Sequence, residues 1–96
     1  MDNLREKKIK MLYRLGKRNF AGAKLKKAEF QETVLAGANF SEADLAGANF
    51  AFCDLRGVDF TGANLRDAAF LGADLRGAKL AGALVLGARF FKARFK

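Results

Sequence analysis

The sequence predicts an all-β solenoid, because three features of the 96-residue chain recur every five residues. A large apolar residue (Leu, Phe or Val) occupies all 17 positions spaced five apart from Leu15 to Phe95. Alanine fills 12 of the 15 positions that lie two residues earlier, from Ala23 to Ala93. Nine of the ten glycines lie two residues after a large residue. Such regularity indicates one structural unit that is stacked many times.

A period of five residues fits neither an α-helix nor a continuous strand. On a helix, five residues advance by about 500°, so the large residues would spread over every side. On a strand, alternate large residues would face opposite ways. We therefore expect a short extended segment whose small and large residues point inward, followed by a turn that Gly permits. Each unit then forms one side of a coil, and successive coils stack at about 4.8 Å.

A second, longer period also supports stacked coils, because the large residue alternates strictly between Leu and Phe from Leu15 to Leu75. A coil with an even number of units places Phe on Phe and Leu on Leu. The segments AGANF, SEADL, TGANL and LGADL carry this pattern. They resemble the pentapeptide-repeat family, whose consensus is A(D/N)LxG, and the resemblance covers about residues 18–96.

The resemblance implies a right-handed quadrilateral β-helix with four pentapeptides per coil and about four coils in this chain. Phe and Leu would then form separate ladders inside the column. The implied ladders are Phe20, Phe40, Phe60 and Leu80; Phe30, Phe50, Phe70 and Phe90; Leu35, Leu55 and Leu75; and Leu25, Leu45 and Leu65.

Residues 1–16 are expected to form an N-terminal capping helix, and residues 17–96 the pentapeptide-repeat β-helix. Within the helical stretch 3–15, Asn3 and Glu6 match a capping box, and Gly16 matches a C-terminal stop. The face expected to cover the first coil consists of Leu4, Met11 and Leu15, widened by Ile9 and Leu12. Because five basic residues lie in positions 5–14, an alternative interpretation is that this helix lies on a membrane surface. The stretch LYRLGKRNF also resembles the lead-in of some bacterial pentapeptide proteins, cyanobacterial ones among them.

Short polar residues occupy the position before many of the large residues. Such side chains bond local backbone groups at turns, so we expect a structural role here and not a metal or catalytic one. The seven residues are Asn39, Asp44, Asn49, Asp54, Asp59, Asn64 and Asp74. Asp54 and Asp74 would lie about one strand spacing apart, and they are the one pair to check for an ion.

Charge is segregated along the chain, whose net charge is +8. Residues 1–27 carry ten basic and two acidic groups, residues 28–75 two basic and eight acidic, and residues 76–96 six basic. Inhibition of DNA gyrase by mimicry of duplex DNA is the best-known activity of the family, and it needs a continuous negative surface. In this chain the acidic residues are confined to the middle, between two basic ends, so this function is kept only as an alternative. Binding of nucleic acid is the opposite alternative, for which Arg56, Arg76 and Lys96 in one outward column, with Arg66 on another side, form a candidate basic surface. No aromatic residue is interleaved with these bases as a single-strand binder requires, so nucleic acid is not the favoured partner.

Exposed apolar residues favour a protein contact instead. Phe52, Leu71 and Phe91 occupy outward positions in the same or adjacent columns, and Leu84 and Leu86 lie on another side. Phe95 belongs to a last coil that lacks a predicted lid, so its edge and apolar end are exposed. The family resemblance implies a homodimer through this C-terminal coil.

The sequence lacks the residues that several functions need. The sequence has no His, Ser41 has no neighbouring base, and Cys53 takes an inward position where the thiol should be buried. We therefore expect no enzyme, cofactor or metal site. No apolar run reaches the roughly 18 residues that span a bilayer, and no signal peptide is recognisable, which favours the cytoplasm. The sequence thus predicts a non-enzymatic protein-interaction scaffold with an unknown partner.

Overall fold

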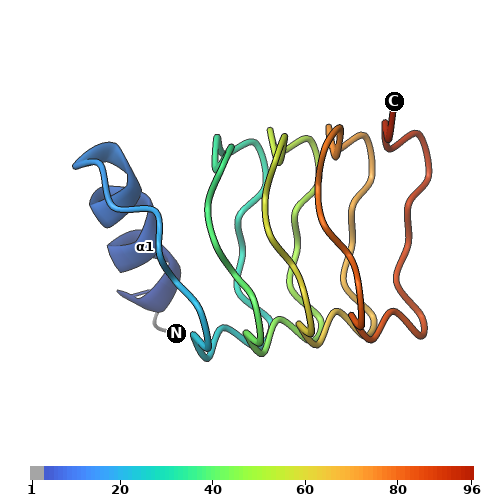
Figure 1. The fold of residues 1–96 in the computed structure, drawn as a ribbon, viewed down its shortest axis with the longest axis horizontal. Helices are drawn as coiled ribbons and strands as arrows, with labels where there is room; N and C mark the ends of the chain where they lie inside the picture. The colour runs from blue at the N-terminus through green and yellow to red at the C-terminus, as the bar shows by residue number, and fades with distance from the viewer. Residues whose placement is uncertain (1–3) are drawn as a thin grey trace.

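Backbone pairing repeats every twenty residues in the structure, a computed structural model that describes residues 4–96. Residues twenty apart form 12 parallel bridges, as in the series Asn19, Asn39, Asp59 and Lys79. Each bridge is isolated between two-residue turns, so the extended segments are short and no long strand forms. Four five-residue units therefore complete one circuit of the chain before it pairs with itself (Figure 1).

We call residues 18–37, 38–57, 58–77 and 78–96 the first, second, third and last coil. Each coil hydrogen-bonds to the next through N–H groups of its large residues, as from Phe30 to Asn49 O at 2.8 Å and from Phe50 to Ala69 O at 2.7 Å. Contacts between coils thus follow one register along the whole stack.

The large residues form the ladders that the sequence predicts. Phe30, Phe50, Phe70 and Phe90 stack with ring centroids 5.3, 5.2 and 5.0 Å apart and ring planes within 10° of parallel. The Phe20, Phe40 and Phe60 rings stack at 5.5 and 6.1 Å. The leucine ladders of the first three coils are also buried. In the last coil Val85 and Phe95 remain exposed, because no further described coil covers them.

The helix α1, Leu4–Arg14, lies against the first coil at one end of the stack (Figure 1). Ile9 is buried in the core, and Leu12 and Tyr13 are partly buried against it. The Tyr13 hydroxyl donates a hydrogen bond of 2.6 Å to Ala36 O, and the Arg5 guanidinium donates one of 2.8 Å to Lys26 O. These bonds fix the helix to the backbone of the first coil.

The predicted contact face of the helix is wrong in part. Met11 and Leu15 are exposed, and Leu15 follows the end of the helix. Ile9 and Leu12 do pack against the core, as predicted, and Tyr13 packs with them. Glu6 shares this face because positions 6, 9 and 13 align on one side of a helix. Asn3 of the predicted capping box lies outside the described residues.

Every turn from residue 22 to residue 92 has its second residue at positive φ, which glycine accepts most readily. Six of these residues are not glycine, and Phe52 at a φ of 58° is the bulkiest of them. Its ring covers Gly72 in the next coil, where an added Cβ would lie 2.6 Å from Phe52 Cε1. Gly57 has a similar φ of 68° but open space around its Cα.

This difference predicts that Gly72→Ala destabilises the protein more than Gly57→Ala. Both variants put a side chain at positive φ, at a cost of about 1–2 kcal/mol in the free energy of unfolding. Gly72→Ala also displaces the Phe52 ring, for which we expect about 0.5–1 kcal/mol more. Urea unfolding measures both values. In a Phe52→Ala background, the two glycine variants should lower the free energy of unfolding by the same amount. A difference that persists there would contradict the proposed effect of the Phe52 ring.

Candidate protein-interaction surface

The turn residues have the structural role that the sequence predicts. All seven Asn and Asp side chains named above accept a hydrogen bond from the backbone N–H two residues later. For example, Asn39 Oδ1 accepts from Ser41 N at 2.8 Å, and Asp59 Oδ1 accepts from Thr61 N at 2.8 Å. Each such bond ties the polar side chain to its own turn.

Asp54 and Asp74 bind arginines. Arg56 donates to both carboxylate oxygens of Asp54, at 2.8 and 2.7 Å, and Arg76 does the same to Asp74, at 2.8 and 2.6 Å. Arg56 Nε also lies 4.0 Å from Asp74 Oδ2. No group of three or more metal-ligating side chains occurs within residues 4–96.

These ion pairs change the candidate basic surface. Arg56 and Arg76 are each matched by a carboxylate on the same side of the solenoid, so their charge is largely neutralised there. The hydrogen bonds from Arg76 lower the pKa of Asp74 from 3.8 to about 2. Lys96 and Arg66 are exposed, with Arg66 on a different side. The structure therefore does not join the four predicted residues into one positive surface.

Cys53 is buried, as expected. Its Sγ lies 2.9 Å from Phe30 O, to which the thiol donates. Burial raises the pKa of the Cys53 thiol to about 11, so the reactive thiolate is scarce at neutral pH.

Three of the predicted apolar residues gather on one side of the solenoid. Phe52, Leu71 and Phe91 are 58%, 38% and 69% exposed. Their backbones are neighbours, because Phe52 N bonds Leu71 O at 2.8 Å and Gly72 N bonds Phe91 O at 2.9 Å. They come from the second, third and last coils and form a continuous apolar strip.

A shallow groove of about 320 Å³ runs along this strip. Its lining residues are Asn49, Ala51, Ala69, Leu71, Arg89 and Phe91. We call it the side groove, and the side that carries it, residues 28–32, 48–52, 68–72 and 88–92, the groove side. The sequence interpretation missed Asn49, Ala69 and Arg89. Reading every twentieth residue from Glu29 would have found them, because that series forms one column of bridges.

The other predicted interface residues lie elsewhere. Leu84 and Leu86 are 43% and 80% exposed and belong to the side that precedes the groove side in the last coil. Phe95, 46% exposed, belongs to the side that follows. The six predicted residues therefore do not form one patch.

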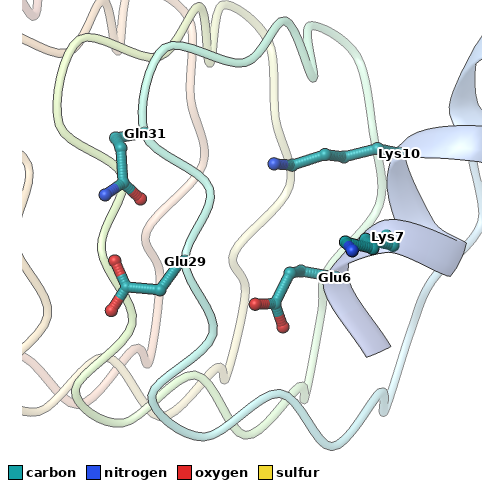
Figure 2. Close-up of a pocket in the computed structure, with 5 residues that line it drawn as sticks. All are labelled: Glu6, Lys7, Lys10, Glu29 and Gln31. Atoms are coloured by element: carbon teal, nitrogen blue, oxygen red, sulfur yellow. The ribbon is translucent and has the colours of Figure 1, made fainter. Parts of the chain in front are cut away.

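A second hollow, of about 220 Å³, lies between α1 and the first coil. Figure 2 shows its lining side chains, which are Glu6, Lys7, Lys10, Glu29 and Gln31. Sequence reasoning did not identify this site, because it depends on how the helix packs. Its charges are mixed in sign, which defines no ligand class.

The Arg76–Asp74 pair predicts a pH-dependent effect of Asp74→Asn, which keeps the turn-bonding oxygen but removes the charge. Because folding lowers the pKa of Asp74, its charge stabilises the fold above the unfolded pKa of 3.8. That contribution disappears as the pH falls through about 2. We expect the wild type to have a higher free energy of unfolding than Asp74→Asn at pH 7, and this difference to disappear by about pH 2. Urea unfolding across this range measures the gap, and Asp44→Asn, whose residue has a turn bond but no arginine partner within residues 4–96, is the control. A gap that is independent of pH would contradict the ion-pair origin.

Comparison with known proteins shows the family. The family model for pentapeptide repeats matches eight copies, over residues 19–50, 43–82 and 70–96. The structure is similar to that of a pentapeptide repeat protein from Nostoc PCC 7120, with a TM-score of 0.92 and 36% identity, over 94% of this chain and 74% of that one. No curated protein matches the sequence.

Two further solved structures are similar over a smaller share of their length. One is a pentapeptide repeat protein from the Arabidopsis thaliana thylakoid lumen, with a TM-score of 0.52 and 32% identity, over 74% of this chain and 57% of that one. The other is the pentapeptide repeat protein Rfr23 from the cyanobacterium Cyanothece 51142, with a TM-score of 0.51 and 27% identity, over 81% and 57%. Within residues 4–96, no helix is long and apolar enough to cross a membrane. The twenty-residue bridges, the repeat matches and the structural neighbours together show that this chain belongs to the pentapeptide-repeat family and has its right-handed quadrilateral β-helix fold.

Proposed function

We propose that this protein is a non-enzymatic scaffold that contacts another protein chain through the groove side. The observation that carries the proposal is Phe52. A bulky residue at positive φ costs backbone energy, and glycine stands at most equivalent turns of this chain. Although its ring covers Gly72, the Phe52 side chain remains 58% exposed, so core packing does not account for it. A binding role for the exposed ring does account for it.

The surroundings of Phe52 favour a protein partner. Leu71 and Phe91 extend the apolar strip over three coils, and the side groove lies beside it. Exposed aromatic side chains on a rigid support are typical anchors of protein interfaces. The buried Cys53 thiol, with its raised pKa, supports a non-enzymatic role.

We also propose that α1 caps the first of about four coils. Ile9 covers the apolar end of the column, and the bonds of Arg5 and Tyr13 to backbone carbonyls hold the helix there. A helix that buries this face against the first coil is not available to lie on a membrane through the same residues.

A homodimer through the C-terminal coil is a separate proposal. Val85 and Phe95 are 43% and 46% exposed in the last coil, and Leu80 and Phe90 are only partly buried. These residues form an apolar surface at the edge of the stack.

The expected cytoplasmic location also stays a prediction.

Site-specific photocrosslinking tests the proposed contact. A benzoylphenylalanine at position 91 is compared with one at position 81, since both positions are exposed and lie at equivalent points of different sides in the last coil. In an extract of the source organism, we expect protein adducts at position 91 in at least about tenfold excess over position 81. Equal yields at the two positions would rule out the groove side as the contact surface.

DNA mimicry is the alternative function, and the ion pairs argue against it. Arg56 and Arg76 neutralise two of the central carboxylates, so the negative surface is even less continuous than the sequence indicates. We expect no inhibition of DNA gyrase supercoiling at micromolar protein. A variant that lacks both arginines, Arg56→Gln with Arg76→Gln, is the matched control for charge. Inhibition by the wild type at that concentration would replace the scaffold proposal with a gyrase-directed function.

A further inference from the structure

The groove side changes character from one end of the solenoid to the other. Three outward columns run along it, and each contributes one residue per coil. From the first coil to the last, the columns are Glu29, Asn49, Ala69 and Arg89; Gln31, Ala51, Leu71 and Phe91; and Glu32, Phe52, Gly72 and Lys92. Within these three columns, the first coil therefore contributes acidic residues, the second and third coils mostly apolar ones, and the last coil basic ones.

The terminal charges of this side are exposed, and none of them forms an ion pair within residues 4–96. Glu29 shares its hollow with Lys7 and Lys10 of α1, which add positive charge beside the acidic end. Glu29 and Glu32 are exposed at one end, and Arg89 and Lys92 at the other. The ion pairs within residues 4–96 all lie on the side that follows. A partner for this side should thus be apolar in its centre, basic where it meets the first coil and acidic where it meets the last.

We propose that this partner is a second copy of the chain, packed antiparallel against the same side. The inference rests on the proposed function, since it names the protein that the groove side contacts. The two-fold axis lies in the interface, perpendicular to the solenoid axis, between the second and third coils. The same surface then meets itself, as in an isologous dimer.

Charge complementarity follows from this symmetry. The rotation places the first coil on the partner's last coil and keeps each column opposite the same column. Glu29 then faces the partner's Arg89, and Glu32 faces the partner's Lys92. Because the interface is symmetric, each of these pairs forms twice.

Side-chain size is complementary as well. Ala51 faces the partner's Leu71, so a small residue receives a large one. Phe52 faces the partner's Gly72, which the partner's own Phe52 ring covers, so the two Phe52 rings would lie against each other near the two-fold axis. Opposed large and small residues let two surfaces approach closely.

A parallel arrangement fails the same comparison. A two-fold axis along the solenoid would place each coil on the same coil of the partner and exchange the outer columns. Glu29 would then face the partner's Glu32, and Arg89 the partner's Lys92. Both ends would bring like charges together, which disfavours this arrangement.

The dimer should be weak. One side of a chain whose extents are 28 × 25 × 23 Å offers less than the roughly 800 Å² per partner of a standard interface. We therefore expect dissociation constants in the micromolar range or above, and the decisive test traps the contact covalently.

The trapping test mixes two purified variants that each add one exposed cysteine, Glu29→Cys and Arg89→Cys, under mild oxidation with diamide. Positions 29 and 89 are three coils apart, about 14 Å at the spacing of paired strands, which exceeds disulfide reach within one chain. The mixture keeps one Glu29–Arg89 pair intact in each mixed dimer. The control mixture is Asn19→Cys with Lys79→Cys, which occupies the corresponding coils on another side. Cys53 is buried and its pKa is raised to about 11, so we expect it to contribute little crosslinking, and each variant alone measures that background.

We expect at least about tenfold more covalent dimer from the Glu29→Cys and Arg89→Cys mixture than from either variant alone or from the control mixture. Equal yields in all samples would overturn the antiparallel contact. Far-ultraviolet circular dichroism confirms that each variant is folded.

Charge exchange gives an independent measurement by sedimentation equilibrium. Glu32→Lys or Lys92→Glu alone puts like charges together twice in the dimer, and we expect each to weaken association by roughly tenfold. The double variant Glu32→Lys with Lys92→Glu should restore wild-type association. Sensitivity to Lys92→Glu alone, without rescue, would indicate a contact through the last coil and overturn the proposal.

The two proposals fail separately. Crosslinks from position 91 to other proteins, with no trapped dimer, would keep the scaffold function and overturn self-association. Crosslinks only between copies of this chain, together with a trapped dimer, would support both.

Discussion

The twenty-residue register between neighbouring coils is the constraint on which the rest of the structure depends. Every N–H that a large residue donates to the next coil requires that register, as in Leu35 to Asp54 O at 2.9 Å and Leu55 to Asp74 O at 2.8 Å. The same register places Phe on Phe inside the column, so backbone pairing and side-chain packing reinforce each other. An insertion of one residue would break both at once, because inward and outward positions would exchange.

The register also determines what the surface can display. In each five-residue unit, two residues point into the core, one carries the polar side chain that bonds the turn, and one adopts a positive φ. Any outward residue is repeated as a column at the coil spacing, so a binding surface on this fold is a set of parallel rows. The ion pairs of Arg56 and Arg76 with their aspartates form one such set, and the groove side forms another.

Much of the fold could be predicted from the sequence, because its determinants are local and periodic. The phenylalanine ladders and the turn bonds of Asn39 and Asp59 follow from composition at fixed spacing. The contact face of α1 could be predicted only in part. Ile9 and Leu12 pack as expected, but Met11 is exposed, because the rotation of the helix is set by the first coil and not by the helix pattern. The neutralisation of Arg76 was missed for another reason. Its side chain was assigned to the surface by column, while its bond to Asp74 joins residues two apart within one turn.

The turn residues at positive φ show how sequence and surface are coupled across coils. Where such a residue is not glycine, its side chain leans toward the next coil, and glycine twenty residues later leaves room for it. Four pairs follow this rule: Lys27 with Gly47, Glu42 with Gly62, Phe52 with Gly72, and Asp67 with Gly87. Glu32 is followed by Phe52 and departs from it. The departure lies on the groove side, where Phe52 occupies the position that glycine fills in the other four pairs, and the Phe52 ring in turn covers Gly72.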